Sequence, residues 1–230
     1  MSLNIGVVMD PIAQIKPWKD TTLAMLLEAQ RRGWNLHYME PADLYVRDGR
    51  VFAVTSDLTV RDDNQDWFTL GEPAPRDLTG MDMILMRQDP PFDAAYLYAT
   101  YLLEKVEREG VLVANRPASV RDSNEKLFAT DFPQCCVPTL VSGRAALLRE
   151  FVKEQGDTVM KPLDAMGGTN VFRIEPGSSN LSVIIDVLTE DGKTPIMAQR
   201  FVPEIKQGDK RILMINGEPV PYALARIPKE

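Results

Sequence analysis

The sequence contains little cysteine or histidine: 230 residues include two cysteines and one histidine. Cys135 and Cys136 are adjacent, and a disulfide between neighbours is strained, so we expect free thiols and a cytoplasmic location. His37 is the single histidine, which excludes a histidine-based triad elsewhere in the chain and indicates a structural residue. Without a cluster of cysteine and histidine, a zinc site is not expected, and the residues suggest no other metal ligands.

The sequence also lacks excess positive charge and long hydrophobic runs. Its net charge is −7, whereas proteins that bind nucleic acids or acidic membranes nonspecifically usually carry a basic surface. No apolar run approaches the roughly 20 residues that a bilayer-spanning helix needs. We therefore expect neither nucleic acid nor membrane as a partner. A hydrophobic content of 44% indicates a globular protein with a substantial core.

The first half of the chain alternates strands with helices. Strands are predicted at residues 5–9, 36–39, 83–86 and 111–114, and helices at residues 21–32 and 93–109. Asp20 is the expected N-cap of the first helix and Gly33 its stop. Asp48 and Gly49 predict a hairpin over residues 45–52. This order predicts an α/β domain with a mainly parallel sheet over residues 1–122.

The second half predicts an α+β domain. Helices are expected at residues 145–155, capped by Ser142, and at 181–189. Strands are expected at 158–161, 171–174 and 196–201, followed by a hairpin that turns at Asn216 and Gly217. Pro117 and Ser119 mark the expected domain boundary, and no repeat or long linker is visible.

Two lysines lie in settings suited to nucleotide phosphates. Lys126 lies in a predicted loop that enters a helix, and Lys161 ends a short strand. The loop after Lys161 contains Gly167 and Gly168, which allow exposed backbone N–H groups to approach an anion. Paired glycines alone more often form a simple turn. The loop is not a Walker loop, and no dinucleotide-binding glycine motif follows the first strand.

Three arginines are further candidates for anion binding. Arg87 follows a predicted buried strand, where it could hold a substrate carboxylate; the alternative is a surface arginine beside the Pro90-Pro91 turn. Arg211 and Arg226 belong to the hairpin that turns at Asn216, which would bring them close together. Two like charges are costly there unless an anion lies between them, although a solvated sheet edge is also possible.

These motifs resemble one family, prokaryotic glutathione synthetase, an ATP-grasp ligase. The similarity runs from Ile5 to Pro228. Its densest stretches are residues 8–12, 25–33, 36–40, 84–93, 124–128, 161–168, 217–222 and 224–228. The glycine loop alone would indicate only the ATP-grasp superfamily, and the N-terminal stretches narrow the resemblance to glutathione synthetase.

The resemblance implies that ATP phosphorylates the cysteinyl carboxylate of γ-glutamylcysteine and that glycine displaces the phosphate, which gives glutathione, ADP and phosphate. It implies that the catalytic residues are Arg211 and Arg226 and that Arg87 binds substrate. It further implies that ATP is bound by Lys126, Lys161, Asp164, Ala165, Met166, Gly167, Gly168, Gln199, Arg200, Phe201, Val202 and Asp209. Within this set, residues 199–202 would meet the adenine through their backbone, and Asp209 would meet the ribose.

The resemblance also implies an N-terminal pre-ATP-grasp substrate domain over residues 1–122. A central ATP-grasp subdomain would cover residues 123–202, and the start of a C-terminal subdomain would cover residues 203–230. Because the sequence ends at Glu230, we expect the ligands for Mg²⁺ in a further segment and the ATP-grasp domain to be incomplete. Ala165 replaces the first glycine of the family loop D-G-x-G-G, which would disfavour a positive φ at that position.

Two alternatives remain open at this point. The loop and lysines would also suit an ATP-grasp enzyme that joins other amino acids. A chain that ends at residue 230 could instead be a non-catalytic nucleotide-binding module. The family resemblance further suggests a homo-oligomer, with a tetramer as the expected state.

Overall fold

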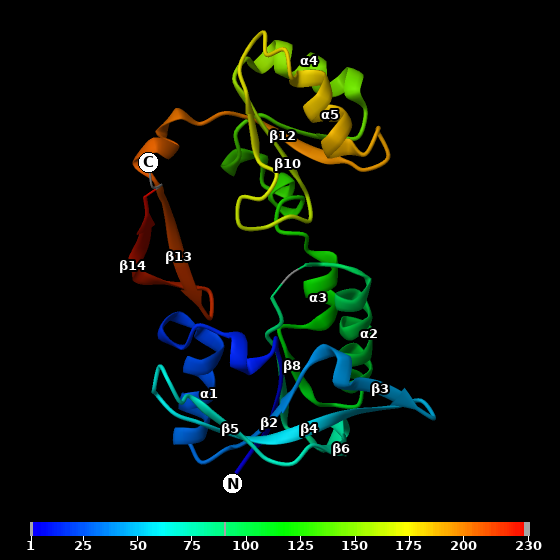
Figure 1. Ribbon diagram of the computed structural model, residues 1–230, viewed down its shortest axis with the longest axis vertical. Coiled ribbons are helices and arrows are strands. Elements are labelled where there is room, and N and C mark those ends of the chain that lie inside the picture. Colours follow the sequence, from blue (N-terminus) through cyan, green and yellow to red (C-terminus); the bar gives the residue numbers. More distant parts are fainter. Residues whose placement is uncertain (1, 90, 228–230) are drawn as a thin grey trace. The chain divides into compact units, whose positions relative to one another are not determined.

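The computed structural model describes residues 2–89 and 91–227 and divides the chain into two compact units, Met1–Glu125 and Lys126–Glu230 (Figure 1). Pro90 of the predicted turn, Pro228 of the family match and the chain end at Glu230 lie outside the described residues. Each unit has its own hydrophobic core.

The first unit is built on one mixed sheet in the order β3-β4-β2-β1-β7-β8, with β5 and β6 also paired to β4. Its strands are β1 (Asn4–Val8), β2 (Asn35–Met39), β3 (Leu44–Arg47), β4 (Arg50–Val60), β5 (Phe68–Leu70), β6 (Ala74–Asp77), β7 (Met83–Met86) and β8 (Leu112–Ala114). Its helices are α1 (Thr21–Arg31), α2 (Ala94–Arg108) and α3 (Pro117–Asp122), with short 3-10 helices η1 (Ile12–Gln14), η2 (Pro17–Lys19), η3 (Pro41–Asp43) and η4 (Leu78–Gly80).

The predicted parallel sheet is confirmed for β2, β1, β7 and β8. The strand β4 instead pairs antiparallel with β2, β3, β5 and β6. The sequence predicted only its hairpin with β3, where Asp48 and Gly49 adopt the expected positive φ values of 52° and 81°. The antiparallel half of the sheet was therefore underestimated.

Alternate residues of β1 face opposite layers. Ile5 and Val7 pack in the cluster that contains Leu26 of α1, whereas Val8 packs in the cluster that contains Leu103 of α2. Because side chains of a strand alternate between its two faces, α1 covers one face of the sheet and α2 the other. The strands between them are buried on both sides, as a parallel sheet requires.

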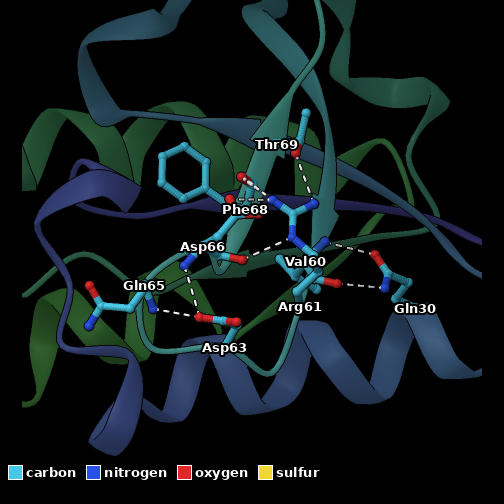
Figure 2. Close-up of polar contacts among 8 residues, drawn as sticks. All are labelled: Gln30, Val60, Arg61, Asp63, Gln65, Asp66, Phe68 and Thr69. Atoms are coloured by element: carbon cyan, nitrogen blue, oxygen red, sulfur yellow. Dashed lines mark hydrogen bonds and ion pairs between the residues drawn. The ribbon is translucent and has the colours of Figure 1, made fainter.

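The N-cap prediction for α1 is confirmed, since the Asp20 carboxylate accepts a 2.7 Å hydrogen bond from the Leu23 amide. Further along α1, the Gln30 side-chain amide exchanges two 2.8 Å hydrogen bonds with the backbone of Val60, at the end of β4. These bonds join the helix to the antiparallel half of the sheet, and Figure 2 shows both of them.

The loop between β4 and β5 is organised around one guanidinium group, that of Arg61 (Figure 2). It donates to the side chain and carbonyl of Asp66, to the Phe68 carbonyl and to the Thr69 hydroxyl, at 2.7–2.9 Å. In the same loop, Asp63 accepts from the amides of Gln65 and Asp66. The polar loop is therefore ordered by its own side chains.

The second unit contains a four-stranded antiparallel sheet in the order β11-β10-β12-β9 and a separate hairpin of β13 and β14. Its strands are β9 (Thr139–Ser142), β10 (Thr158–Pro162), β11 (Phe172–Ile174), β12 (Ile196–Arg200), β13 (Asp209–Ile215) and β14 (Glu218–Arg226). Its helices are α4 (Ala145–Gln155), α5 (Leu181–Thr189) and the short 3-10 helices η5 (Phe128–Asp131), η6 (Pro133–Cys135) and η7 (Pro203–Gln207). The helices α4 and α5 contact each other and share a core cluster with the sheet (Figure 1).

Three local expectations differ from the structure. Ser142 does not cap α4: it ends β9, and the N-cap position is held by Arg144, whose amide donates to the Ser142 hydroxyl at 2.9 Å. Pro117 and Ser119 lie within α3, because proline suits the first turn of a helix, and the two compact units divide after Glu125. Lys126 lies in a turn that precedes a 3-10 helix rather than an α-helix.

Candidate nucleotide and substrate sites

The first lysine of the predicted phosphate site contacts the glycine loop directly. The ammonium group of Lys126 donates to the carbonyl of Leu163 at 3.3 Å and to that of Ala165 at 2.5 Å. Lys161 lies in β10, paired with Met197 of β12, two residues before Leu163. The two lysines, 35 positions apart in sequence, therefore belong to one loop region of the second unit.

The loop between β10 and β11 exposes its backbone at the glycines. Gly167, Gly168 and Asn170 have positive φ values of 66°, 82° and 56°. Asp164, Met166, Gly167 and Gly168 are exposed. An anion can therefore approach their N–H groups. Ala165 is not among the residues with positive φ, so its methyl group causes no backbone strain in this conformation.

The predicted adenine-binding segment comprises the last two residues of β12 and the two residues after it. The amides of Arg200 and Phe201 already donate within the protein, to the carbonyls of Pro138 at 3.1 Å and Asp157 at 2.8 Å. Gln199 donates through its side chain to the Thr139 hydroxyl at 3.0 Å. Across residues 2–89 and 91–227, the Val202 amide donates to no acceptor of the protein. Of the backbone amides of residues 200–202, that of Val202 is therefore the one left to bind a ligand.

The hairpin places both predicted catalytic arginines on one face. In its register, Asp209 lies opposite Arg226 and Arg211 lies opposite Leu224. Positions 209 and 211 share a face because they are two residues apart on β13, and the residues opposite them share that face. Arg211 and Arg226 are therefore diagonal neighbours.

One of these arginines, Arg226, is paired with a carboxylate of the chain itself, that of Asp209. Arg226 binds Asp209 in bidentate fashion, with Nε–Oδ1 and Nη2–Oδ2 distances of 2.7 and 2.5 Å. The hydrogen bond from Arg226, aided by the charges of Arg226 and Arg211, holds the pKa of Asp209 below its usual value. The same bond raises the pKa of Arg226. Asp209, predicted to contact ribose, thus also positions Arg226.

Arg87 lies in the first unit, immediately after β7. Its amide donates to the Val8 carbonyl at 2.7 Å, which places it at the carboxyl ends of β1 and β7. Its guanidinium donates from Nε to the Thr22 hydroxyl at 3.1 Å and from Nη2 to the Thr21 hydroxyl at 3.0 Å. Within the described part of the chain no carboxylate pairs with Arg87, so its charge remains available to an acidic ligand.

Two features of these sites were missed from the sequence. The Oε1 atom of Gln88, next to Arg87, is buried and has no hydrogen-bond partner in the described residues. In the second unit, Arg173 binds Asp157 and stacks on Phe201 beside the adenine-binding segment. No spacing rule in the sequence joins residues 157, 173 and 201, because strand register alone brings them together.

Within the described residues, no group of three or more histidine, cysteine, aspartate or glutamate side chains could hold a metal ion. In the same part of the chain, no helix is both long and apolar enough to cross a membrane. His37 lies in the first unit, where its Nδ1 forms a 2.9 Å hydrogen bond with the Asp57 carboxylate. Cys135 and Cys136 are free thiols.

Comparison with known proteins identifies both halves of the chain. Residues 3–121 match the family model for the prokaryotic glutathione synthetase N-terminal domain, and residues 125–230 match the model for the prokaryotic glutathione synthetase ATP-grasp domain. The glutathione synthetase of Pseudomonas putida is 58% identical over 228 residues, which cover 99% of this chain and 72% of that protein. The glutathione synthetase of Pseudomonas aeruginosa is 56% identical over 230 residues, or 100% of this chain and 73% of that protein.

Solved structures with low sequence identity share the fold. The D-cycloserine synthetase DcsG superposes with a TM-score of 0.61 at 16% identity and covers 98% of this chain and 72% of its own. The D-alanyl-alanine synthetase A of Vibrio cholerae gives a TM-score of 0.57 at 9% identity and covers 96% of this chain and 66% of its own. At such identities the similarity concerns the ATP-grasp architecture alone.

Proposed function

The chain belongs to the prokaryotic glutathione synthetase family, and on this premise we propose that it joins γ-glutamylcysteine to glycine at the expense of ATP. It is an ATP-dependent carbon–nitrogen ligase. The observation that carries this conclusion is the match of both halves to this family, together with relatives more than half identical along nearly the whole chain.

The chemistry requires an activated carboxyl group. A carboxylate does not react with an amine under mild conditions, because its charge repels the nucleophile and oxide is a poor leaving group. Transfer of the terminal phosphoryl group of ATP to the cysteinyl carboxylate gives an acyl phosphate and ADP. The glycine amine then attacks the acyl carbon, loses a proton and expels phosphate, which leaves the amide of glutathione. Both steps depend on positioning and on stabilisation of negative charge.

Lys126 and Lys161 would hold the ATP phosphates, with the loop from Asp164 to Gly168 closing over them. Lys126 already binds two carbonyl groups near this loop, so an incoming phosphate would compete with neutral acceptors for its ammonium group. A charged acceptor forms the stronger hydrogen bond. The exposed N–H groups at Gly167 and Gly168 would add further donors.

The adenine would lie against the backbone of Gln199, Arg200, Phe201 and Val202, with the Val202 amide as the donor to a ring nitrogen. Asp209 would contact the ribose and, through Arg226, organise the reaction centre. Arg211 and Arg226 would stabilise the charge of the acyl phosphate as it forms and collapse. Arg87 would hold a carboxylate of the dipeptide, since Thr21 and Thr22 fix its guanidinium in one direction.

Mg²⁺ is the expected companion of ATP in this family. The described residues provide no cluster of three or more histidine, cysteine, aspartate or glutamate side chains that could hold it. We also propose a cytoplasmic location, a homotetramer and small-molecule substrates, in line with the family resemblance. Light scattering tests the assembly, and a monomer would contradict the tetramer.

Phosphate release from ATP tests the proposed reaction. Release should require γ-glutamylcysteine and glycine together, and mass spectrometry should identify glutathione as the product. No release with both substrates present would refute the proposal. A panel of other amino-acid acceptors tests the competing ligase activities, which would be favoured if glycine proved a poor acceptor. ATP binding without turnover would instead indicate a nucleotide-binding module.

A further inference from the structure

Three residues outside the predicted ATP-binding loop fix the position of the segment at residues 199–202, which would contact the adenine base. Arg173 lies on β11, opposite Val159 of β10, and Asp157 immediately precedes β10. Phe201 immediately follows β12, on the other side of β10. Strand register therefore brings together residues that lie 16 and 28 positions apart in sequence.

Each pair within this set is in contact. The Arg173 guanidinium binds the Asp157 carboxylate through Nη2–Oδ2 at 2.6 Å and Nε–Oδ1 at 3.0 Å. The central carbon of the same guanidinium lies 4.1 Å from the ring centroid of Phe201. The Phe201 amide donates to the Asp157 carbonyl at 2.8 Å. We call Asp157, Arg173 and Phe201 the edge clamp.

The edge clamp fixes the residue that directly precedes Val202. The hydrogen bond from Phe201 fixes its backbone, and stacking on Arg173 fixes its ring, so Phe201 is held at two points. Arg173 is in turn held by a carboxylate whose pKa is lowered by that bond. The direction of the Val202 N–H group therefore depends on the clamp.

We propose that Asp157 and Arg173 are positioning residues that orient the backbone at Val202 to recognise adenine. This inference rests on the proposed ATP site. Adenine presents an unprotonated N1 that accepts a hydrogen bond, whereas the N1 of guanine carries a proton. A correctly oriented Val202 amide therefore favours adenine, and a misdirected one loses that preference without affecting the phosphate contacts.

ATP and GTP test the proposal, because they share ribose and phosphates and differ only in the base. In Arg173→Met the Kd for ATP should rise roughly tenfold, as for the loss of one well-formed hydrogen bond, whereas the Kd for GTP should stay unchanged. Arg173→Lys should retain part of the preference. Phe201→Tyr keeps the aromatic ring and should keep the preference for ATP over GTP. Phe201→Leu removes the ring and should lose that preference.

Two further variants serve as controls. Arg149→Met removes an arginine of α4 that donates a hydrogen bond to Ser182 at 3.4 Å, and it should leave both affinities unchanged. Lys161→Met should weaken ATP and GTP equally. If Arg173→Met melted at a lower temperature but kept the ratio of the two affinities, the clamp would be only structural and the proposal wrong. A wild-type protein that bound neither nucleotide would refute the ATP site itself, and this inference with it.

Discussion

Arg226 binds the carboxylate of Asp209 from across the β13–β14 hairpin with two hydrogen bonds. Both groups are partly exposed, and such pairs contribute little to stability in water. The pair instead fixes the orientation of the Arg226 guanidinium. A guanidinium that is bound along one edge presents its three remaining N–H donors in fixed directions, so Asp209 controls the orientation of the Arg226 charge.

Replacing Asp209 by asparagine should therefore affect the reaction more than the binding of ATP. Asp209→Asn keeps the size of the side chain but cannot accept two charge-assisted bonds from Arg226. We expect kcat to fall roughly tenfold or more, since each 1.4 kcal/mol of lost transition-state stabilisation is a factor of ten. Steady-state kinetics with ATP varied measure the effect.

Lys210→Met is the matched control for Asp209→Asn, because its side chain lies on the opposite face of β13 and its loss should leave kcat unchanged. A rise in the KM for ATP with kcat unaltered would show that Asp209 acts only on the ribose and does not position Arg226.

Arg87 should determine the affinity for the dipeptide. Arg87→Met removes the guanidinium that Thr21 and Thr22 orient. The KM for γ-glutamylcysteine should rise about ten- to hundredfold, as for the loss of a charge-assisted contact, with the affinity for ATP unchanged. Arg47→Met, at the exposed tip of the β3–β4 hairpin, is the control. Equal KM values for wild type and Arg87→Met would leave Arg87 as a structural residue that anchors α1.

The buried Oε1 atom of Gln88 should make this residue unfavourable for folding. An unsatisfied buried acceptor costs about 1–3 kcal/mol, so Gln88→Met should raise the free energy of unfolding. Urea denaturation measures the change. A loss of stability would show that the carbonyl oxygen is satisfied in solution, for example by water.

Most of the longer strands and helices were predictable because they depend on local signals, whereas β5, β6, β9 and α3 were not predicted. Asp20 caps α1 as expected, and the turns at Asp48-Gly49 and Asn216-Gly217 adopt the positive φ values that their sequences favour. The prediction for Ser142 was wrong, because a serine that precedes a helix can accept a hydrogen bond from a backbone amide just before the helix instead of capping it. Here its hydroxyl accepts from the Arg144 amide. The antiparallel partners of β4 were underestimated because pairing between distant segments leaves no periodic signal in either one.

The candidate site likewise contains some contacts that were predictable from the sequence and others that were not. Lys126 and the glycine loop could be associated from their types and order, and the structure joins them by hydrogen bonds. The edge clamp could not be predicted, since Asp157, Arg173 and Phe201 meet only through the register of three strands. Likewise, the pairing of Arg226 with Asp209 could not be predicted before the hairpin register was known.

His37 should make the stability of the first unit depend on pH. The residue is 5% exposed, and burial, aided by the charge of Arg76, lowers the pKa of its imidazole below 6.5, while Asp57 opposes the shift. Just below pH 6.5 the unfolded chain thus binds a proton that the folded chain does not. This contribution to stability is complete above that pH and is lost as the pH falls through the lowered pKa.

Urea midpoints between about pH 7.5 and about pH 5.5 measure this loss, and His37→Gln should flatten the profile because no other histidine titrates there. The single imidazole also gives one set of NMR signals, from which the pKa can be read directly. A pKa above 6.5 would show that the Asp57 carboxylate outweighs burial, and stability would then rise on acidification through this range.

Lys161→Met tests the phosphate site most directly. Methionine keeps the apolar stem of the side chain but removes its charge. A charge-assisted contact to phosphate contributes about 1.5–3 kcal/mol, so the affinity for ATP should fall roughly ten- to hundredfold. Calorimetry measures the affinity, and a thermal melt of the same sample verifies that the variant is folded. Lys153→Met, which removes a lysine from the last turn of α4, is the control and should bind ATP normally. Unaltered ATP binding in Lys161→Met, whatever its melting temperature, would refute the assignment of Lys161 to the phosphates.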